Sequence, residues 1–320
     1  MSERQAVYSL SVCGRAILDM HSLNNEGGEG NQIATRMVNV VYRDRASGEY
    51  KLATVNAVSG DMFKHIQAEH LYLLAKGKLP LCAGCQKFST SRILDDAEFI
   101  STLPPQDSAV IDTLLKRCAL DDMEGNLIAK GARSVPRKSV AEFGWVVGVP
   151  DHTTTESYFH VRYAAERGER AEGAQQQAIF HRPASSGVYA IVANFEMARI
   201  GFNDISQQYP IADDEREGRY LALLESILYT FIEPSGAMRG TQNPHIVEFE
   251  GVVTVTNQVM PAPALSPLDE NYRQDVEKVA GALNGLKPGA VTVHRFDSMG
   301  QFAEVMKELI GGTRPYKLAW

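Results

Sequence analysis

The sequence lacks the features that mark secreted and membrane proteins. Only four cysteines occur in 320 residues, which is too few for a disulfide framework and indicates a reducing compartment. No apolar run approaches the roughly 18 residues that a membrane helix needs. The chain starts Met-Ser-Glu-Arg-Gln and continues directly into a strand-like segment, which does not resemble a secretory signal. We therefore expect a cytoplasmic protein with no membrane partner.

An excess of positive charge is also missing. The 32 lysines and arginines are outnumbered by 39 aspartates and glutamates, so the net charge is −7, whereas free-standing nucleic-acid binders are usually basic. The cations are unevenly placed, however, with one group at 130–138 and another at 162–170. Local basic tracks on an acidic body favour a subunit that binds one RNA inside an assembly over a promiscuous polyanion binder.

Several ligand-binding signatures are absent. The glycine-rich segment 21–31 has neither the lysine of a Walker loop nor the spacing of a dinucleotide fingerprint. No strand-like segment carries the RNP1 signature, whose aromatic side chains let ordinary RRM domains stack on bases. No helix-turn-helix pattern with a basic recognition helix is evident, and no internal repeat is found. No cofactor is required by any of these patterns.

The rest of the sequence is typical of a globular protein, with 44% hydrophobic and 22% charged residues. Apolar periodicity and turn signals predict both strands and helices. Without two middle segments, 80–150 and a long polar hairpin at 151–187, their order is compatible with an α+β, RRM-like (ferredoxin-like) core. The predicted strands are 7–18, 37–42, 52–58, 143–149, 188–195, 246–255 and 290–296, and the helices are 59–76, 219–232 and 299–310.

Two polar segments are candidates for holding a phosphate backbone. In 21–31, glycines allow close approach of the main chain, and asparagines can bond to sugar or phosphate groups. In 58–70, a capped helix begins with Lys64 in its first turn, and the unpaired amides of a helix start attract phosphate. Both patterns also suit proteins without a ligand, the first as an exposed strand connection and the second as an ordinary capped helix.

These segments resemble the DevR-type backbone subunit of type I CRISPR surveillance complexes (Cascade). The C-terminal third resembles this family less distinctively, chiefly at the turn 234–240. Four stretches in the same order carry the likeness: Arg15 with Asp-Met-His-Ser-Leu-Asn-Asn at 19–25 and Glu-Gly-Asn at 29–31, Val-Ser-Gly-Asp-Met-Phe-Lys-His at 58–65, Cys-Ala-Leu-Asp-Asp-Met-Glu-Gly-Asn-Leu at 118–127 with Arg-Lys-Ser-Val at 137–140, and Arg-Pro-Ala-Ser-Ser-Gly-Val-Tyr at 182–189.

The resemblance implies an RRM-like palm (1–79 and 188–320), a finger insertion (80–150) and a thumb hairpin (151–187). Copies of such a protein would stack in a helical filament along a guide RNA (crRNA), beside other Cascade subunits, leaving bases free to pair with a target DNA strand. A role without enzymatic activity follows. The residues implied to bind RNA are Arg15, His21, Asn24, Asn25, Lys64 and His65 in the palm, Arg133, Arg137 and Lys138 in the fingers, and Arg182 and Arg239 in later turns.

Two other functions remain open at this point. Backbone subunits of related type III complexes cut target RNA with an aspartate after the first strand, and Asp19 lies near that place, so an endoribonuclease is the first alternative. A transcriptional autoregulator or plain scaffold is the second, because the family name has carried that association.

The cysteines pose a separate question. Cys82 and Cys85 form a C-x-x-C pair, and Cys118 follows in the same insertion. With His70 as a fourth ligand they would suit a structural zinc ion, since tetrahedral sites of sulfur and nitrogen stabilise segments that lack a core of their own. The alternative is that His70 packs in the core and the C-x-x-C pair binds nothing.

Overall fold

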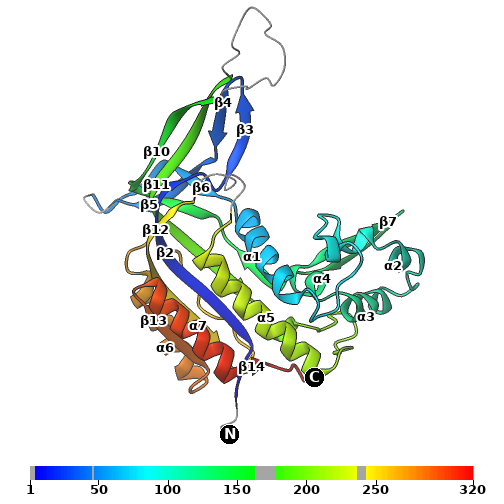
Figure 1. Ribbon diagram of the computed structural model, residues 1–320. Coiled ribbons are helices and arrows are strands. Elements are labelled where there is room, and N and C mark those ends of the chain that lie inside the picture. Colours follow the sequence, from blue (N-terminus) through cyan, green and yellow to red (C-terminus); the bar gives the residue numbers. More distant parts are fainter. Residues whose placement is uncertain (1–3, 45–46, 163–177, 236–242, 320) are drawn as a thin grey trace, which may run out of the picture.

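The computed structural model describes residues 4–44, 47–162, 178–235 and 243–319. It has a mixed α/β fold around a large antiparallel sheet with the strand order β13-β12-β2-β11-β10-β6-β5 (Figure 1). At one end of β11, the short strand β9 (Ala141–Phe143) pairs with residues 193–195. The other bounds are β2 (Ser9–His21), β5 (Met37–Arg43), β6 (Tyr50–Val58), β10 (Val146–Arg162), β11 (Ala178–Phe195), β12 (His245–Thr256) and β13 (Val291–Phe296).

Helices cover both faces of this sheet, as the alternation of side chains along β2 requires. Val12 points into the main core, together with residues of α1 (Gly60–Ala75), α5 (Asp213–Ile232) and α7 (Met299–Gly312). Its neighbour Cys13 points to the opposite face, where α6 (Tyr272–Leu286) packs. The face with α1, α5 and α7 is called the three-helix face below, and the other is called the α6 face.

Most of the predicted elements are confirmed. The predicted hairpin at 37–58 is β5 and β6, and the predicted helix after Ser59 is α1, whose N-cap Ser59 accepts a hydrogen bond from the amide of Met62 at 3.1 Å. Segment 21–31, predicted as a connection, instead contains β3 (Asn25–Glu29). This strand pairs with β4 (Gln32–Thr35), and β4 in turn pairs with β11 at His181, so the hairpin extends the sheet. The helix α6 was not predicted.

An arm projects from one end of the sheet (Figure 1). It consists of the outer halves of β10 and β11, which pair from Thr153–Gly187 outward, and of the β3–β4 hairpin beside them. The predicted hairpin at 151–187 is therefore confirmed in its paired strands, while its tip, 163–177, lies outside the described residues. Where the arm meets the body, the register shifts in both ladders of β11, and Asp151 adopts a positive φ of 63°.

Residues 80–137, most of the predicted finger insertion and given that name below, form a small, mostly helical region beside α1 (Figure 1). It contains η1 (Cys85–Lys87), η2 (Arg92–Asp95), α2 (Ala97–Ser101), α3 (Asp107–Arg117), α4 (Ala119–Glu124), β7 (Asn126–Lys130) and β8 (Arg133–Arg137). All six residues of α4 are buried.

Three further short elements of the described chain lie outside the insertion. The strand β1 (Gln5–Val7) pairs with β14 (Thr313–Pro315), and η3 (Met197–Arg199) follows β11.

A glycine at the start of α1 allows the helix to approach β9 closely. A Cβ atom on Gly60 would lie 2.2 Å from the carbonyl oxygen of Phe143. We expect Gly60→Ala to lower the free energy of unfolding by about 1–3 kcal/mol, since two main chains must move apart. Gly281→Ala is the control: it lies in α6 with no atom within 4 Å of its added Cβ. It should raise stability by about 0.5–1 kcal/mol in the same urea titration; equal effects would contradict this account.

Candidate nucleic-acid interface

Two polar residues of segment 21–31, His21 and Asn24, join a largely buried network at the base of the arm. Tyr189 donates a hydrogen bond to Asn56 Oδ1 at 2.8 Å, and Asn56 Nδ2 donates to Thr35 Oγ1 at 3.0 Å. Thr35 in turn donates to the carbonyl oxygen of Asn24 at 2.9 Å. The ring of His21 packs edge-on against Tyr189, with centroids 4.8 Å apart. This network joins the β3–β4 hairpin to the sheet.

His21 and Asn24 are thus placed beneath the surface. His21 is 2% exposed and Asn24 is 7% exposed. Within the described residues, neither ring nitrogen of His21 nor Nδ2 of Asn24 has a hydrogen-bond partner. Burial lowers the pKa of His21 to about 4, so its ring is neutral at pH 7. The sequence-based prediction that these side chains contact RNA directly is corrected: they support the base of the arm.

Lys64 and Lys138 lie near one carboxylate beside the start of α1. Glu142 of β9 pairs with Lys138 at 3.3 Å, and its charge also acts on Lys64. Burial lowers the pKa of Lys64, whose other nearby charges include the buried carboxyl of Glu124. His65 is exposed next to them, with its ring 5.5 Å from that of Phe88. The structure therefore gathers three of the predicted RNA-binding residues at this edge of the three-helix face.

Arg15 lies on the opposite face of the sheet. It donates a hydrogen bond to the carbonyl oxygen of Pro267 at 2.8 Å, and its guanidinium lies 5.9 Å from the ring centroid of Tyr272 in α6. It borders an open groove of about 910 Å³ whose lining mixes polar and apolar side chains. The structure thus does not bring Arg15 together with Lys64. Charges of both signs line this groove, the basic Arg15 and Arg43 and the acidic Asp44, Asp151, Asp269, Glu270 and Asp275.

The finger arginines are engaged in protein contacts. Arg133 bonds to Asp107 Oδ1 at 2.5 Å and to the carbonyl oxygen of Pro104 at 2.6 Å. Arg137 has no exposed side-chain surface and contacts Asp122 at 2.6 Å. A guanidinium that is buried and paired cannot meet a phosphate, so the prediction that Arg137 binds RNA is corrected to a structural role.

The remaining predicted residues lie on the arm or outside the described chain. Arg182 is half-buried on β11, directly opposite Tyr158 of β10. Asn25 begins β3, where its main chain pairs with Thr35. Arg239 lies outside the described residues, so its predicted role stays a prediction.

Sequence reasoning missed one exposed pair near the base of the arm. The guanidinium of Arg36 lies 5.4 Å from the ring centroid of Trp145, which is 45% exposed. Arg36 also pairs with Glu26 at 2.7 Å. An indole flanked by glycine at 144 was the available signal, but the sequence did not place it beside a cation. Such a surface suits stacking of a nucleic-acid base and contact with a phosphate.

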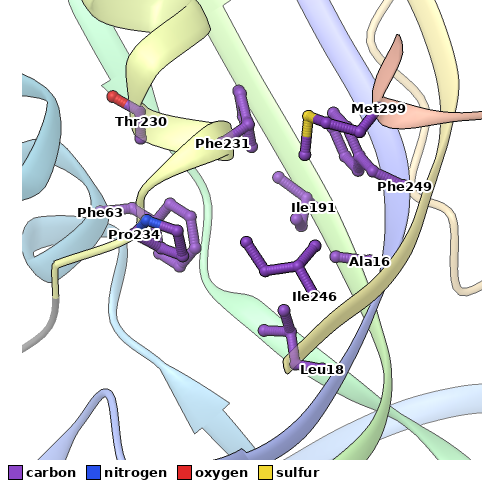
Figure 2. A pocket seen from close by; sticks show the side chains of 10 residues that line it. All are labelled: Ala16, Leu18, Phe63, Ile191, Thr230, Phe231, Pro234, Ile246, Phe249 and Met299. Carbon is purple, nitrogen blue, oxygen red and sulfur yellow. The ribbon is translucent and has the colours of Figure 1, made fainter. Parts of the chain in front are cut away.

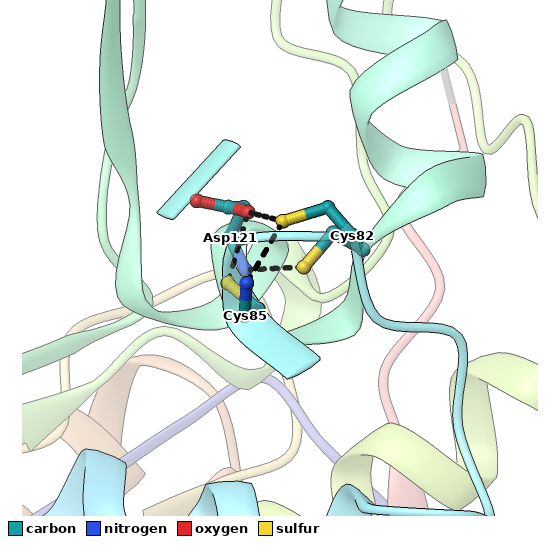
Figure 3. A group of neighbouring side chains, drawn as sticks. Cys82, Cys85 and Asp121 are labelled. Atoms are coloured by element: carbon teal, nitrogen blue, oxygen red, sulfur yellow. Dashed lines mark hydrogen bonds between the residues drawn. The ribbon is translucent and has the colours of Figure 1, made fainter. Parts of the chain in front are cut away.

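The predicted metal ligands are only partly brought together. Cys82, Cys85 and Cys118 lie with Asp121, and their ligand atoms are all within 4.8 Å of one another (Figure 3). Burial raises the pKa of Asp121 to about 7. His70 is elsewhere: its Nε2 lies 3.1 Å from the carbonyl oxygen of Glu233. The prediction of His70 as the fourth ligand is therefore wrong, because the His70 side chain points from α1 toward α5 and not toward the finger insertion.

Asp19, the residue of the nuclease alternative, lies near the end of β2 and pairs with His245 of β12. Within the described residues it is not part of a group of three or more His, Cys, Asp or Glu side chains that could hold a metal ion. Its position therefore adds no specific support to a metal-dependent nuclease.

A small cavity lies on the three-helix face, between the sheet and the helices α1, α5 and α7 (Figure 2). Its free volume of about 10 Å³ is about enough for one water molecule, and its lining is almost wholly apolar. Figure 2 shows Phe63, Ile191 and Ile246 around it. We regard this space as a packing defect of the core, because Thr230, the one polar side chain in its lining, already donates a hydrogen bond to the carbonyl oxygen of Ser226.

No helix in the described part of the chain is long and apolar enough to cross a membrane.

Known proteins resemble this chain over most of its length. It is 25% identical over 252 residues to CRISPR-associated protein Cas7/Csa2 1 of Saccharolobus solfataricus, covering 76% of this chain and 77% of the relative. It is 24% identical over 276 residues to CRISPR-associated protein Cas7/Cst2/DevR of Methanocaldococcus jannaschii, covering 80% and 83%.

Two solved structures share the fold. A chain of a CRISPR RNA-guided surveillance complex in a pre-nicking state aligns with a TM-score of 0.50 at 14% identity, covering 93% of this chain and 99% of that one. A second surveillance complex gives a TM-score of 0.50 at 12% identity, with 95% and 98% covered. The model of the family described as "CRISPR-associated negative auto-regulator DevR/Csa2" matches residues 12–277. The chain therefore belongs to the CRISPR-associated DevR/Csa2 family.

Proposed function

We propose that this protein is the backbone subunit of a type I CRISPR surveillance complex (Cascade), which lines up in several copies along a guide RNA. The family match over residues 12–277 carries the proposal, because it includes the arm, the finger insertion and most of the sheet. The protein would bind the RNA through phosphates and 2′-hydroxyls, since guide sequences vary and base edges must stay free for the target DNA strand.

The strand order supports an RRM-like palm within the larger sheet. In chain order, β2, α1, β9, β11, α5 and β12 form a β-α-β-β-α-β unit. Their order in the sheet is β12-β2-β11-β9, and every neighbouring pair is antiparallel. This is the arrangement of the ferredoxin-like motif. The arm and the finger insertion would then be additions to this palm.

Exposed apolar side chains support stacking of copies. The register of β5 with β6 puts Met37, Val41, Tyr50 and Leu52 on one face of that hairpin, and all four are exposed. On the arm, Phe159 is 58% exposed. A head-to-tail assembly buries two different surfaces of each copy. The apolar face of the β5–β6 hairpin and the side of the arm that carries Phe159 could serve as these surfaces.

The proposal is tested by titrating the purified protein with an RNA of guide length. We expect a series of complexes that each contain one RNA molecule and differ in mass by one protein chain of 35.2 kDa. The measurement is native mass spectrometry, with an unrelated RNA sequence of equal length expected to behave alike. A protein that stays monomeric with its cognate guide RNA would contradict the proposal.

Lys64→Ala and Lys138→Ala should each weaken RNA binding without sequence dependence. Each loss of a phosphate contact should flatten the slope of log affinity against log salt by about 0.7–1. Fluorescence anisotropy over a salt series measures this slope. Lys307→Ala, on α7 and away from the arm and the fingers (Figure 1), is the control and should leave the slope unchanged. An unchanged slope for both test variants would count against this edge as the RNA track.

We further propose that the subunit is not an enzyme. Incubating the RNA-bound protein with complementary RNA and magnesium checks this point. Cleavage at regular intervals that Asp19→Ala abolishes would instead establish the endoribonuclease alternative. The autoregulator alternative is checked in parallel by gel shift, in which promoter duplex should bind far more weakly than guide RNA.

A further inference from the structure

The finger insertion contains a cluster of three thiols and one carboxyl group that the RNA-binding role does not use. Cys82 lies in the turn before η1 and Cys85 begins η1, whereas Cys118 is the N-cap of α4 and Asp121 lies in its first turn. Each of the four residues is at most 1% exposed. A buried carboxyl beside three thiols is costly unless a cation or further hydrogen bonds compensate it.

The distances within the cluster match those of a tetrahedral zinc site. Asp121 Oδ2 lies 3.3 Å from the sulfur atoms of both Cys82 and Cys85. Zinc bonds of about 2.3 Å to sulfur and about 2.0 Å to oxygen give a sulfur–oxygen edge of about 3.5 Å and a sulfur–sulfur edge of about 3.8 Å. Since all ligand atoms are within 4.8 Å of one another, closing the site requires shifts of no more than about 1 Å.

Neighbouring groups hold these ligands in place. Asn126 donates a hydrogen bond from Nδ2 to Asp121 Oδ1 at 2.7 Å. The other oxygen, Oδ2, faces the thiols of Cys82 and Cys85 (Figure 3). The amide of Cys85 donates to Cys82 Sγ at 3.3 Å, and the amide of Asp121 donates to Cys118 Sγ at 3.4 Å. Such outer bonds orient ligands and stabilise thiolates. Gly84 is required in the turn, because its Cβ would lie 1.9 Å from the carbonyl oxygen of Arg92.

We propose that Cys82, Cys85, Cys118 and Asp121 bind one structural zinc ion. All four positions would be filled by protein side chains, which is the closed arrangement of structural sites and leaves no position for a reacting water. The ion would fix the turn after α1 to the start of α4. Because Asp122, the next residue, bonds to Arg219 of α5 at 2.7 Å, the site would also help to orient the finger insertion on the palm.

The test is the metal content of the full chain after purification without a chelator. Inductively coupled plasma mass spectrometry measures it. We expect about one zinc per chain in the wild type. Cys13→Ser is the matched control, because this fourth buried cysteine lies on the α6 face and outside the cluster. His70→Ala is a second control. Both should keep the zinc, whereas Cys85→Ser should lose it.

Asn126→Ala keeps all four ligands and so tests the site even if Cys85→Ser fails to fold. Loss of an outer hydrogen bond should weaken zinc binding about 10–100-fold in competition with a chromogenic chelator. Cobalt(II) added to metal-free wild type should give the thiolate charge-transfer and intense visible bands of a tetrahedral site. Wild-type protein that holds neither zinc nor cobalt would overturn the proposal, and so would loss of the metal in Cys13→Ser with retention in Cys85→Ser.

Discussion

Replacing Asp122 with asparagine is expected to lower the free energy of unfolding by about 3–5 kcal/mol. Its carboxylate has no exposed surface and pairs with Arg137 at 2.6 Å and Arg219 at 2.7 Å, both also fully buried. It accepts a third hydrogen bond from the amide of Gly201 at 2.9 Å. The change keeps the shape of the side chain but leaves two buried guanidinium groups without their shared counter-charge.

Equilibrium unfolding in urea measures the effect of Asp122→Asn. Glu277→Gln provides the control, because it removes the carboxylate of an ion pair with Arg295 in which both side chains are more than 40% exposed. Exposed pairs contribute less than about 1 kcal/mol. If both variants fell by the same small amount, the buried network would not be what joins α4 to β8 and α5. Arg137→Ala should likewise lower the free energy of unfolding, because it removes one partner of this buried network. We expect this loss of stability in the absence of RNA.

The second large effect is a pH-dependent contribution of His21 to stability. Burial lowers its pKa from 6.5 to about 4, so between these values the unfolded chain binds a proton that the folded chain does not. Stability from this residue is complete above pH 6.5 and falls as the pH drops toward 4. The shift corresponds to about 3 kcal/mol at the acid end.

Glu124 acts in the opposite direction. Burial raises its pKa to about 7, so the folded state holds a proton that the unfolded state releases, and this term gains stability as the pH falls from 7 to 4.5. The pH profile of the wild type alone is therefore not diagnostic. The useful quantity is the difference in unfolding free energy between the wild type and His21→Phe, which keeps an aromatic ring against Tyr189.

We expect this difference to change by about 3 kcal/mol in favour of His21→Phe between neutral pH and pH 4. Urea titrations at several pH values measure it. Gly281→Ala changes no titratable side chain and should run parallel to the wild type at every pH. A constant difference for His21→Phe across the range would show that His21 is not buried in its neutral form.

Local patterns in the sequence were sufficient for much of the sheet and for α1. The turn chemistry between β5 and β6 and the Ser59 cap involve residues close together in the chain, and both are found as predicted. The helix α6 was missed, because Gly281 and Gly285 lower its helix propensity and it forms by packing on β13.

Long-range contacts explain the errors in the candidate site. Asp121 lies 36 residues from Cys85, and only the folding of the finger insertion brings the carboxylate to the thiols. Arg137 stands in a basic run that predicts an exposed face, yet it is buried and bonds to the carboxylate of Asp122 and to three main-chain carbonyl groups. Sequence spacing carries no information on such partners.

The register shifts at the root of the arm have a mechanical consequence. Both ladders of β11 are interrupted at the same level, between Gly148 and Thr153 on one side and between Ser185 and Gly187 on the other. Bulges bend and twist strands locally while the ladders on either side stay intact. In the proposed row of stacked copies, a small change of angle at this joint would be repeated at every subunit, so that a few residues could determine the pitch of the assembly.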